Sequence, residues 1–183
     1  MIEKKLIAKI TDQDILGIPP KEMKDYTKRL GARGIVIRDD GKIALFNKSN
    51  KNEYKLPGGG IENDEDPELA FKREALEETG CEIEIIEELG ITEENKNQNN
   101  FKQISYVYVA KVINDTHSFN FTQKEIDEGA KLLWVEKEKA LELITNCYDN
   151  LKASIYENVY QTQFVVLRDR KILEYYLEKI NGN

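Results

Sequence analysis

The sequence predicts one domain of the α/β or α+β class, because strand-like and helix-like segments alternate along the chain. Three observations support this. A strand–turn–strand pattern surrounds Asp40-Gly41, a helix with recognisable ends lies between residues 66 and 80, and apolar residues recur at helical spacing near the C-terminus. The chain has 183 residues, enough to bury a core without disulfide bonds or a structural metal.

The first sixty residues are predicted to form short strands and the loops between them. Asp40-Gly41 is a strong two-residue hairpin turn between β-forming segments. Three glycines at 58–60 mark backbone that adopts unusual dihedral angles or approaches something closely. In order, we predict a strand at 5–10, a loop with a short amphipathic stretch at 11–30, a hairpin at 34–46 and a loop at 48–53.

The helix that begins after residue 66 has the clearest boundaries. Asp66 is suited to the N-cap and Pro67 to the first helical position. Gly80 is suited to the left-handed residue that ends a helix after Thr79. We expect its core face to carry Leu69, Phe71, Ala75 and Leu76.

The rest of the chain is predicted to hold two more long strands, one short strand and further helix. The first of these strands alternates imperfectly, and the second is rich in tyrosine and β-branched residues. In order, we predict a strand at 82–91, an asparagine-rich loop at 92–100, a strand at 103–113, a polar loop at 114–130, a strand at 132–135, a helix at 136–145 and mostly helix at 148–180.

Charge and cysteine content exclude several classes of protein. The net charge of −7 argues against a broad basic surface for nucleic acid. Cys81 and Cys147 are too few for a disulfide scaffold and are expected to be small buried side chains in a reducing compartment. Without an apolar run of signal or membrane-spanning length, we expect a cytoplasmic protein with no membrane association.

Three glutamates on the helix at 66–79 suggest a metal site. Glu74, Glu77 and Glu78 are spaced i, i+3 and i+4, so they share one face of the helix. Such carboxylates repel each other, and a divalent cation would relieve the repulsion. Hard oxygen ligands favour Mg²⁺ or Mn²⁺. The alternative is an acidic face that only meets solvent, which is the usual explanation for a glutamate-rich helix.

The wider spacing favours the metal site over the solvated face. The pattern is a glycine, five residues, a glutamate, seven residues, Arg-Glu, two residues, Glu-Glu, one residue and a glycine. A chance match in a chain of this composition is on the order of one in 10⁵. The seven fixed positions are Gly59, Glu65, Arg73, Glu74, Glu77, Glu78 and Gly80.

This stretch, from Gly59 to Cys81, resembles the Nudix box, the signature of hydrolases that act on a nucleoside diphosphate linked to another moiety. The last position of the box is usually aliphatic and here is Cys81, a small apolar side chain. The resemblance implies an α/β fold, specifically an α/β/α sandwich with a mixed central sheet. It suggests an N-terminal extension at 1–30, the Nudix domain at 31–147 and a helical C-terminal extension at 148–183 packed on the same domain.

The resemblance also implies roles for individual residues. Family members often use a further glutamate from a later loop as ligand or general base. Glu128 is the first candidate for it and Glu125 the second, while the alternative for Glu128 is a solvated loop glutamate. The implied metal ligands are Glu74, Glu77, Glu78, Glu128 and the carbonyl of Gly58. Catalytic roles fall to Glu74, Glu78 and Glu128, with Glu78 or Glu128 as the base. Structural support comes from Gly59, Gly80 and a pair between Glu65 and Arg73, for which an ordinary surface ion pair is the alternative.

The implied activity is metal-dependent pyrophosphohydrolysis of a small nucleotide. A nucleoside triphosphate or similar small nucleotide is favoured. ADP-ribose or another nucleotide sugar, a dinucleotide polyphosphate and an RNA 5′ end are alternatives. A non-catalytic nucleotide-binding module is disfavoured because every box glutamate is present. An isoprenoid diphosphate isomerase is disfavoured because His117 is the only histidine. The C-terminal stretch could cap the site, complete the core or pair two subunits as a homodimer.

Overall fold

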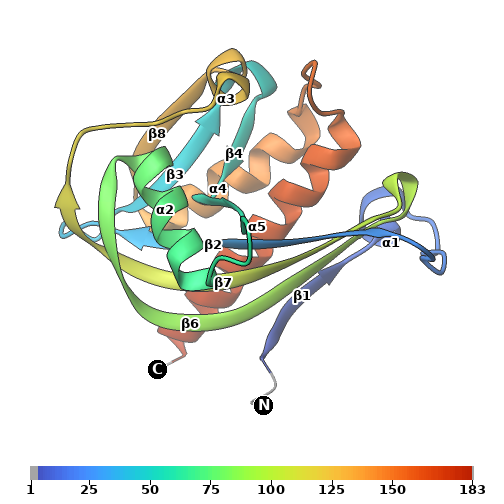
Figure 1. The fold of residues 1–183 in the computed structure, drawn as a ribbon, viewed down its shortest axis with the longest axis horizontal. Helices are drawn as coiled ribbons and strands as arrows, with labels where there is room; N and C mark the ends of the chain where they lie inside the picture. Colours follow the sequence, from blue (N-terminus) through green and yellow to red (C-terminus); the bar gives the residue numbers. More distant parts are fainter. Residues whose placement is uncertain (1–3, 183) are drawn as a thin grey trace.

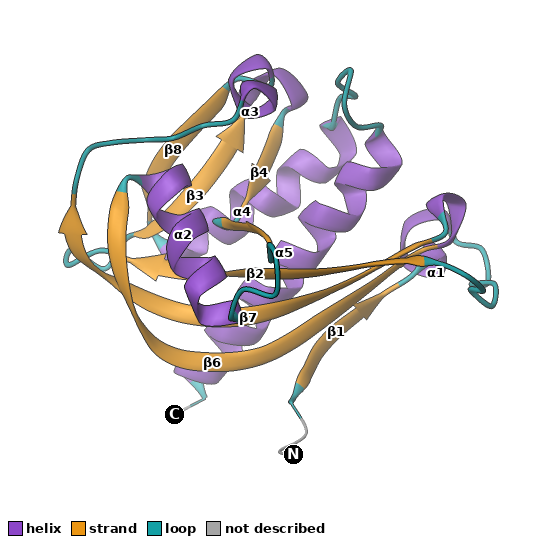
Figure 2. Cartoon of the chain, viewed as in Figure 1, coloured by secondary structure: helices purple, strands orange, loops and turns teal. Residues whose placement is uncertain are grey.

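The computed structural model describes residues 4–182 and is built around an eight-stranded mixed sheet (Figures 1 and 2). The strand order is β1-β6-β7-β2-β3-β4, with β5 paired to β2 and β8 paired to β3. The strands are β1 Leu6–Ile10, β2 Thr27–Ile37, β3 Ile43–Lys48, β4 Glu53–Lys55, β5 Gly58–Gly60, β6 Cys81–Lys96, β7 Phe101–Asp115 and β8 Ala130–Val135. The helices are α1 Asp12–Leu16, α2 Pro67–Thr79, α3 Gln123–Asp127, α4 Lys137–Cys147 and α5 Val159–Asn181, with short 3-10 turns at Ser49–Lys51, Asn97–Asn99 and Tyr148–Asn150.

Helices cover both faces of the sheet, which confirms the α/β/α sandwich (Figure 1). Adjacent side chains of a strand point to opposite faces, so β2 contributes to two cores. Val36 packs with Phe71 of α2 on one face. Ile35 packs with Ile144 of α4 and Leu173 of α5 on the other. The box helix therefore lies on the opposite face of the sheet from the two C-terminal helices.

β6 and β7 form a long antiparallel pair, and β6 is longer than the sequence pattern predicts. Residues 92–100 were expected to form a loop, but β6 continues to Lys96 and only 97–100 forms the turn. The loop prediction is wrong because polar side chains in this segment are buried in the strand rather than exposed. Thr92 and Glu94 are fully buried, and Glu94 accepts a hydrogen bond from Arg168 of α5 at 2.9 Å. Polar strand residues are thus covered by a helix far away in the sequence.

The ends of the box helix agree with the prediction, but its core face does not. The Asp66 carboxylate accepts a hydrogen bond from the backbone N–H of Glu68 at 2.9 Å, and Gly80 is left-handed with φ 69°. Leu69 and Leu76 are 58% and 38% exposed, so placing them in the core was wrong. The side chains that the helix turns toward the sheet are Ala70, Phe71, Ala75 and Glu78. The helix face that carries the box glutamates therefore overlaps the face that packs on the sheet.

A pair of substitutions on this helix tests the corrected core face. Phe71→Ala is expected to lower the free energy of unfolding by about 3–5 kcal/mol, because the ring is fully buried and stacks on Tyr108 at 5.8 Å. Leu69→Ala on the same helix should change it by less than about 1 kcal/mol, since its side chain is mostly exposed. Urea denaturation measures both. Equal losses from the two variants would contradict the helix orientation.

Segments at both ends of the chain join the same structure. The strand predicted at 5–10 is confirmed as β1, which pairs in parallel with β6. The hairpin at 34–46 is confirmed as β2 and β3, although β2 begins already at Thr27. In the C-terminal segment, helix is wrong for residues 151–158, and α5 begins only after Asn158, whose side chain caps it. Within residues 4–182, no helix combines the length and the apolar character needed to cross a membrane.

Candidate active site

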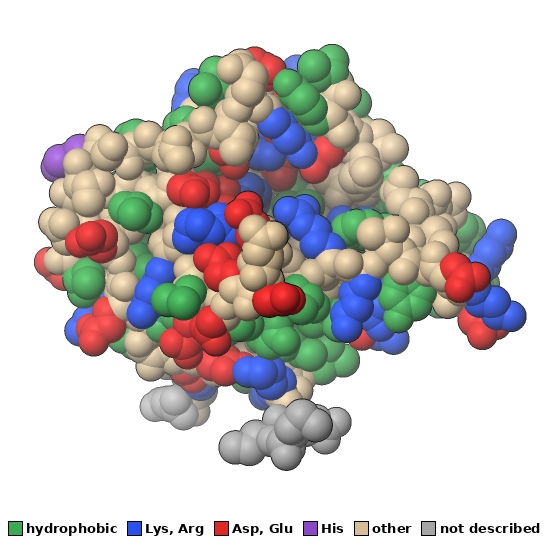
Figure 3. All heavy atoms as spheres, in the orientation of Figure 1, with side chains coloured by type: hydrophobic (Ala, Val, Ile, Leu, Met, Phe, Trp, Pro, Cys, Tyr) green, Lys and Arg blue, Asp and Glu red, His purple; other side chains and the backbone are tan. Residues whose placement is uncertain are grey.

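A cavity of about 520 Å³ lies where the glycine-rich turn, the box helix and α5 meet. Figure 3 shows acidic and basic side chains gathered in the middle of this face of the molecule. One part of the lining is acidic, with Glu62, Glu74, Glu77, Glu78 and Glu125. Basic side chains also line the cavity: Lys55 and Arg73 contact two of these glutamates, and Arg29, Arg33, Lys96 and Arg168 lie elsewhere in the lining. The cavity can therefore hold cations and anions side by side.

Glu78 is the most deeply buried of the box glutamates. It is 2% exposed, and burial raises its pKa to about 7, against the lowering effect of the Lys55 ammonium. Its Oε2 accepts a hydrogen bond from the backbone N–H of Gly58 at 2.8 Å. A carboxylate with this pKa can take a proton from water near neutral pH. Glu78 thus has the properties of a general base.

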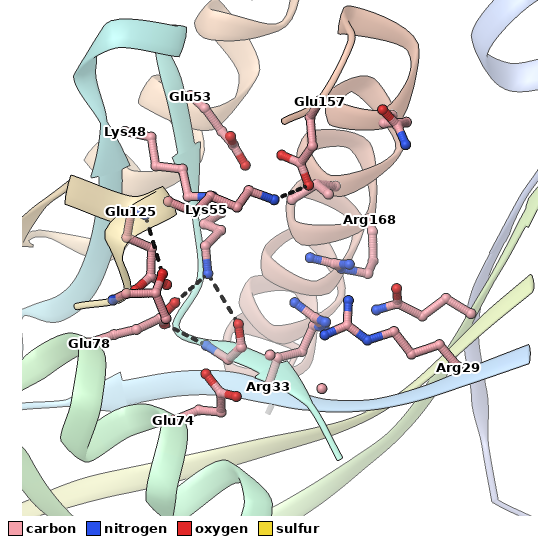
Figure 4. Close-up of a pocket in the computed structure, with 18 of the residues that line it drawn as sticks. Arg29, Arg33, Lys48, Glu53, Lys55, Glu74, Glu78, Glu125, Glu157 and Arg168 are labelled. Atoms are coloured by element: carbon pink, nitrogen blue, oxygen red, sulfur yellow. Dashed lines mark hydrogen bonds and ion pairs between the residues drawn. The ribbon is translucent and has the colours of Figure 1, made fainter. Parts of the chain in front are cut away.

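Lys55 connects Glu78 to the glycine-rich turn. Its ammonium lies 2.7 Å from Glu78 Oε1 and donates a hydrogen bond to the Gly58 carbonyl at 3.1 Å (Figure 4). These two oxygens are among the ligands predicted for a metal. The ammonium is a cation that contacts both at once. The pair of oxygens is therefore arranged to receive positive charge.

Arg73 organises the rest of the box. It contacts both oxygens of Glu65, at 3.2 and 3.0 Å, so the predicted Glu65–Arg73 contact is present. It also donates to the Gly60 carbonyl at 2.9 Å and to Glu74 Oε1 at 2.9 Å. Glu77 is more distant, at 3.5 Å. One guanidinium thereby ties the loop before α2 to the glycine-rich turn and to the acidic face.

The structure brings Glu74, Glu77 and Glu78 to one cavity but does not close them around one point. Within residues 4–182, no group of three acidic, histidine or cysteine side chains is arranged closely enough to hold a metal ion. The reason is visible in the contacts, because Glu78 is held by Lys55 and Glu74 by Arg73. Basic side chains balance the carboxylates in this arrangement.

Glycines are required where the turn passes the helix. A side chain at Gly59 would collide with the carboxylate of Glu74. Gly58 has φ 139°, and a Cβ there would meet the backbone of β2. Gly80, farther away, ends the helix with φ 69°. Gly58 and Gly59 thus allow β5 to approach both β2 and the acidic helix face closely, and Gly80 serves only to end the helix.

Glu128 and Glu125, the two candidates for a further glutamate, occupy different environments. Glu128 is 1% exposed, does not line the cavity, and is held by Lys48 at 2.8 Å and by the Ser154 hydroxyl at 2.6 Å. Burial by itself would raise the pKa of Glu128, but these partners lower it. Glu125 lines the cavity on the side of Glu78 (Figure 4). The geometry therefore favours Glu125 over Glu128 as the further glutamate of the site.

Several basic residues line the cavity although nothing in the sequence indicated that they belong to the site. Lys55 contacts a glutamate 23 positions away, and Arg168 lies on α5, in the C-terminal stretch for which capping the site was one of three open roles. Arg29 and Arg33 lie on β2. An isolated lysine or arginine carries no local signal, because its function depends on which distant residues surround it. The one clue is the dense charge at 48–55, which begins in the predicted loop at 48–53.

The family comparison covers most of the chain. The model of the NUDIX domain matches residues 27–155. A human diphosphoinositol polyphosphate phosphohydrolase is 28% identical over 139 residues, which are 75% of this chain and 73% of that protein. A MutT-like protein of Streptomyces ambofaciens is 40% identical over 58 residues, but the match spans only 38% of its length and 32% of this chain.

Solved structures agree on the fold. The solution structure of the E. coli ORF135 protein has a TM-score of 0.53 at 18% identity, covering 89% of this chain and 98% of that one. A NUDIX hydrolase from Nitrosomonas europaea also has a TM-score of 0.53 at 18% identity, with 84% and 90% covered. Together with the box and its helix, the domain match shows that this chain is a member of the Nudix hydrolase family.

Proposed function

We propose that the protein is a metal-dependent pyrophosphohydrolase that cleaves a diphosphate bond in a nucleoside diphosphate-linked substrate. The observation that supports this most strongly is the contact of one ammonium, that of Lys55, with both the Gly58 carbonyl and Glu78. It places a cation against two hard oxygen donors beside the acidic helix face. The nucleoside triphosphate or another small nucleotide is the favoured substrate.

The donor set fits a divalent ion such as Mg²⁺ or Mn²⁺. Oxygen ligands from carboxylates and a backbone carbonyl suit both. Glu74, Glu77, Glu78 and the Gly58 carbonyl would hold the ion, once Lys55 and Arg73 release the carboxylates. When bound, the ion supplies charge neutralisation of the diphosphate and acidification of a water. Removing it with EDTA should abolish turnover.

The side chains of the chain itself supply the remaining steps. Glu78 is the proposed general base for the attacking water, since it is buried against the glycine-rich turn and burial raises the pKa of its carboxyl in the metal-free protein. Glu125, which lines the cavity on the same side as Glu78, assists as a second carboxylate. Lys55 neutralises charge that develops on the phosphate. Cleavage then gives two phosphate-bearing products.

A hydrolysis assay over a panel of nucleotides tests this proposal. The panel contains nucleoside triphosphates, ADP-ribose, a nucleotide sugar, a dinucleotide polyphosphate and a capped or triphosphorylated RNA 5′ end, each with Mg²⁺ and with Mn²⁺. We expect metal-dependent release of phosphate products from at least one small nucleotide. Nucleotide binding without turnover in every case would identify a non-catalytic module and contradict the proposal.

Paired substitutions separate the two candidates for the further glutamate. Glu125→Gln is expected to lower kcat by at least about 10-fold with little change in stability, because the carboxylate is at the cavity. Glu128→Gln is expected to lower the melting temperature, because Lys48 and Lys51 would lose a buried counter-charge. Steady-state kinetics and thermal melts measure both. A larger loss of kcat at matched stability for Glu128→Gln would restore the first candidate.

The remaining proposals concern organisation and location. We propose that 31–147 is the catalytic domain, with 1–30 and 148–183 as extensions that pack on it. Support comes from β1 in the sheet and from α5 at the cavity. A reducing, cytoplasmic location is supported by Cys81 and Cys147, which are both buried free thiols.

A further inference from the structure

Arg33 is a buried guanidinium that lacks a counter-ion within the described chain. The residue is 3% exposed and lines the cavity. It forms no ion pair among residues 4–182, and its Nε has no hydrogen-bond partner there. Burial, and then the nearby charge of Arg168, lower its pKa to about 10. Such a buried donor is costly to the fold unless a ligand satisfies it.

Arg168 extends the same cationic wall from α5. It is 1% exposed, donates to Asp169 at 2.7 Å and to Glu94 at 2.9 Å, and still has no partner for Nη2. Lys96 also contacts Glu94, at 3.2 Å. Three buried cations, Arg33, Arg168 and Lys96, thus face two buried carboxylates. Among these five groups the cations outnumber the carboxylates by one, and Glu78 and Glu157 act on them from elsewhere in the cavity lining.

The buried cations of this cluster border the cavity. Arg33, Arg168 and Lys96 all line it, as does the exposed Arg29. Figure 4 shows Arg29, Arg33 and Arg168 together on the side of the cavity away from Glu78. In the β2–β5 ladder Arg33 pairs with Gly58, whose carbonyl contacts Lys55. The cationic wall therefore begins directly beside the acidic site.

We propose that Arg33 and Arg168, with Arg29 and Lys96, form an anion subsite for a phosphate group that the substrate carries in addition to the diphosphate being cleaved. This rests on the proposed function and deepens it. The unused donors, Nε of Arg33 and Nη2 of Arg168, would hydrogen-bond to phosphate oxygens. The subsite favours substrates with three or more phosphates over two-phosphate nucleotide sugars. It binds phosphate independently of the metal.

Binding of inorganic tripolyphosphate to the whole protein in EDTA tests the subsite apart from catalysis. Titration calorimetry should detect binding to the wild type, and Arg33→Met should weaken it at least 10-fold. Arg33→Lys, which keeps the charge, should lie between the two. The matched control is Arg38→Met, because Arg38 follows the same strand but pairs with Asp40 outside the cavity. No binding by the wild type, or equal weakening in the control, overturns the proposal.

A second measurement distinguishes a binding role from a structural one. Without phosphate, Arg33→Met should melt at the same or a higher temperature than the wild type, because an unpaired buried charge is removed. With metal, its preference in kcat/KM for a nucleoside triphosphate over a nucleotide sugar should fall at least 10-fold. A lower melting temperature with unchanged tripolyphosphate affinity, or an unchanged preference, overturns the proposal. If no substrate is hydrolysed while tripolyphosphate binding still depends on Arg33, the proposed function fails and the anion subsite stands.

Discussion

Glu78→Gln is expected to lower turnover at least about 100-fold while leaving the fold intact. The carboxylate is buried, its pKa is raised by burial to about 7, and it contacts both Lys55 and Gly58. The amide has nearly the same shape and can still accept the hydrogen bond from Gly58. It cannot accept a proton from water, and it is a weak ligand for a divalent ion. The variant therefore loses proton transfer and metal binding at this position but keeps the packing of the side chain.

The measurement is kcat on the substrate that the nucleotide panel identifies, together with circular dichroism and a thermal melt. Glu68→Gln is the matched control, since Glu68 lies in the first turn of the same helix, is exposed and does not line the cavity. It should retain wild-type kcat. A Glu78→Gln variant with near-normal turnover would remove Glu78 from both the metal site and the general-base role.

Gly58→Ala is expected to damage stability and activity together. With φ 139°, this backbone conformation costs an alanine about 1–3 kcal/mol. The added Cβ would lie 2.5 Å from the Ala32 carbonyl oxygen and against the Cβ of Arg33. Relief requires β5 to move away from β2, which carries the Gly58 carbonyl and the Glu78 contact with it. We expect a loss of about 3 kcal/mol in the free energy of unfolding and about 100-fold in kcat.

Gly41→Ala separates the steric effect from backbone strain. Gly41 also has positive φ, at 82°, but a Cβ there meets nothing within 4 Å. It should cost about 1 kcal/mol and leave kcat unchanged. Urea denaturation and steady-state kinetics report the two quantities. If Gly58→Ala behaved like Gly41→Ala, the close approach of the glycine-rich turn to β2 would have no functional importance.

The features that could be predicted from sequence are those with local causes. The box helix was located to the residue, because Asp66, Pro67 and Gly80 act within one turn of its ends. The Glu65–Arg73 contact followed from the resemblance and is present. The hairpin around Asp40-Gly41 is predicted correctly, but the two-residue turn is wrong: Arg38 still hydrogen-bonds to Lys42, so the loop has three residues, and of these only Gly41 has positive φ.

The wrong predictions share one cause, which is that the type of a residue does not by itself determine whether its side chain is buried or exposed. Leu69 and Leu76 were assigned to the core, yet the helix turns Ala70 and Glu78 inward instead. Residues 92–96 were assigned to a loop because they are polar, yet α5 buries Glu94 in the strand. The face of a helix that packs on the sheet, and the strand residues that a helix covers, both depend on elements elsewhere in the chain. No local sequence pattern reveals them.

The sequence by itself determined the family, the box helix and the identity of the acidic residues. These features depend on spacing within a 23-residue segment and on caps at its ends. Only the tertiary structure decided which partner each buried charge has. Glu78 pairs with Lys55 and Glu128 pairs with Lys48, while Arg33 lies near Arg168 and forms no ion pair among the described residues. The physical reason is that the free energy of a charge is set by its burial and its neighbours, and both come from segments that meet only when the chain folds.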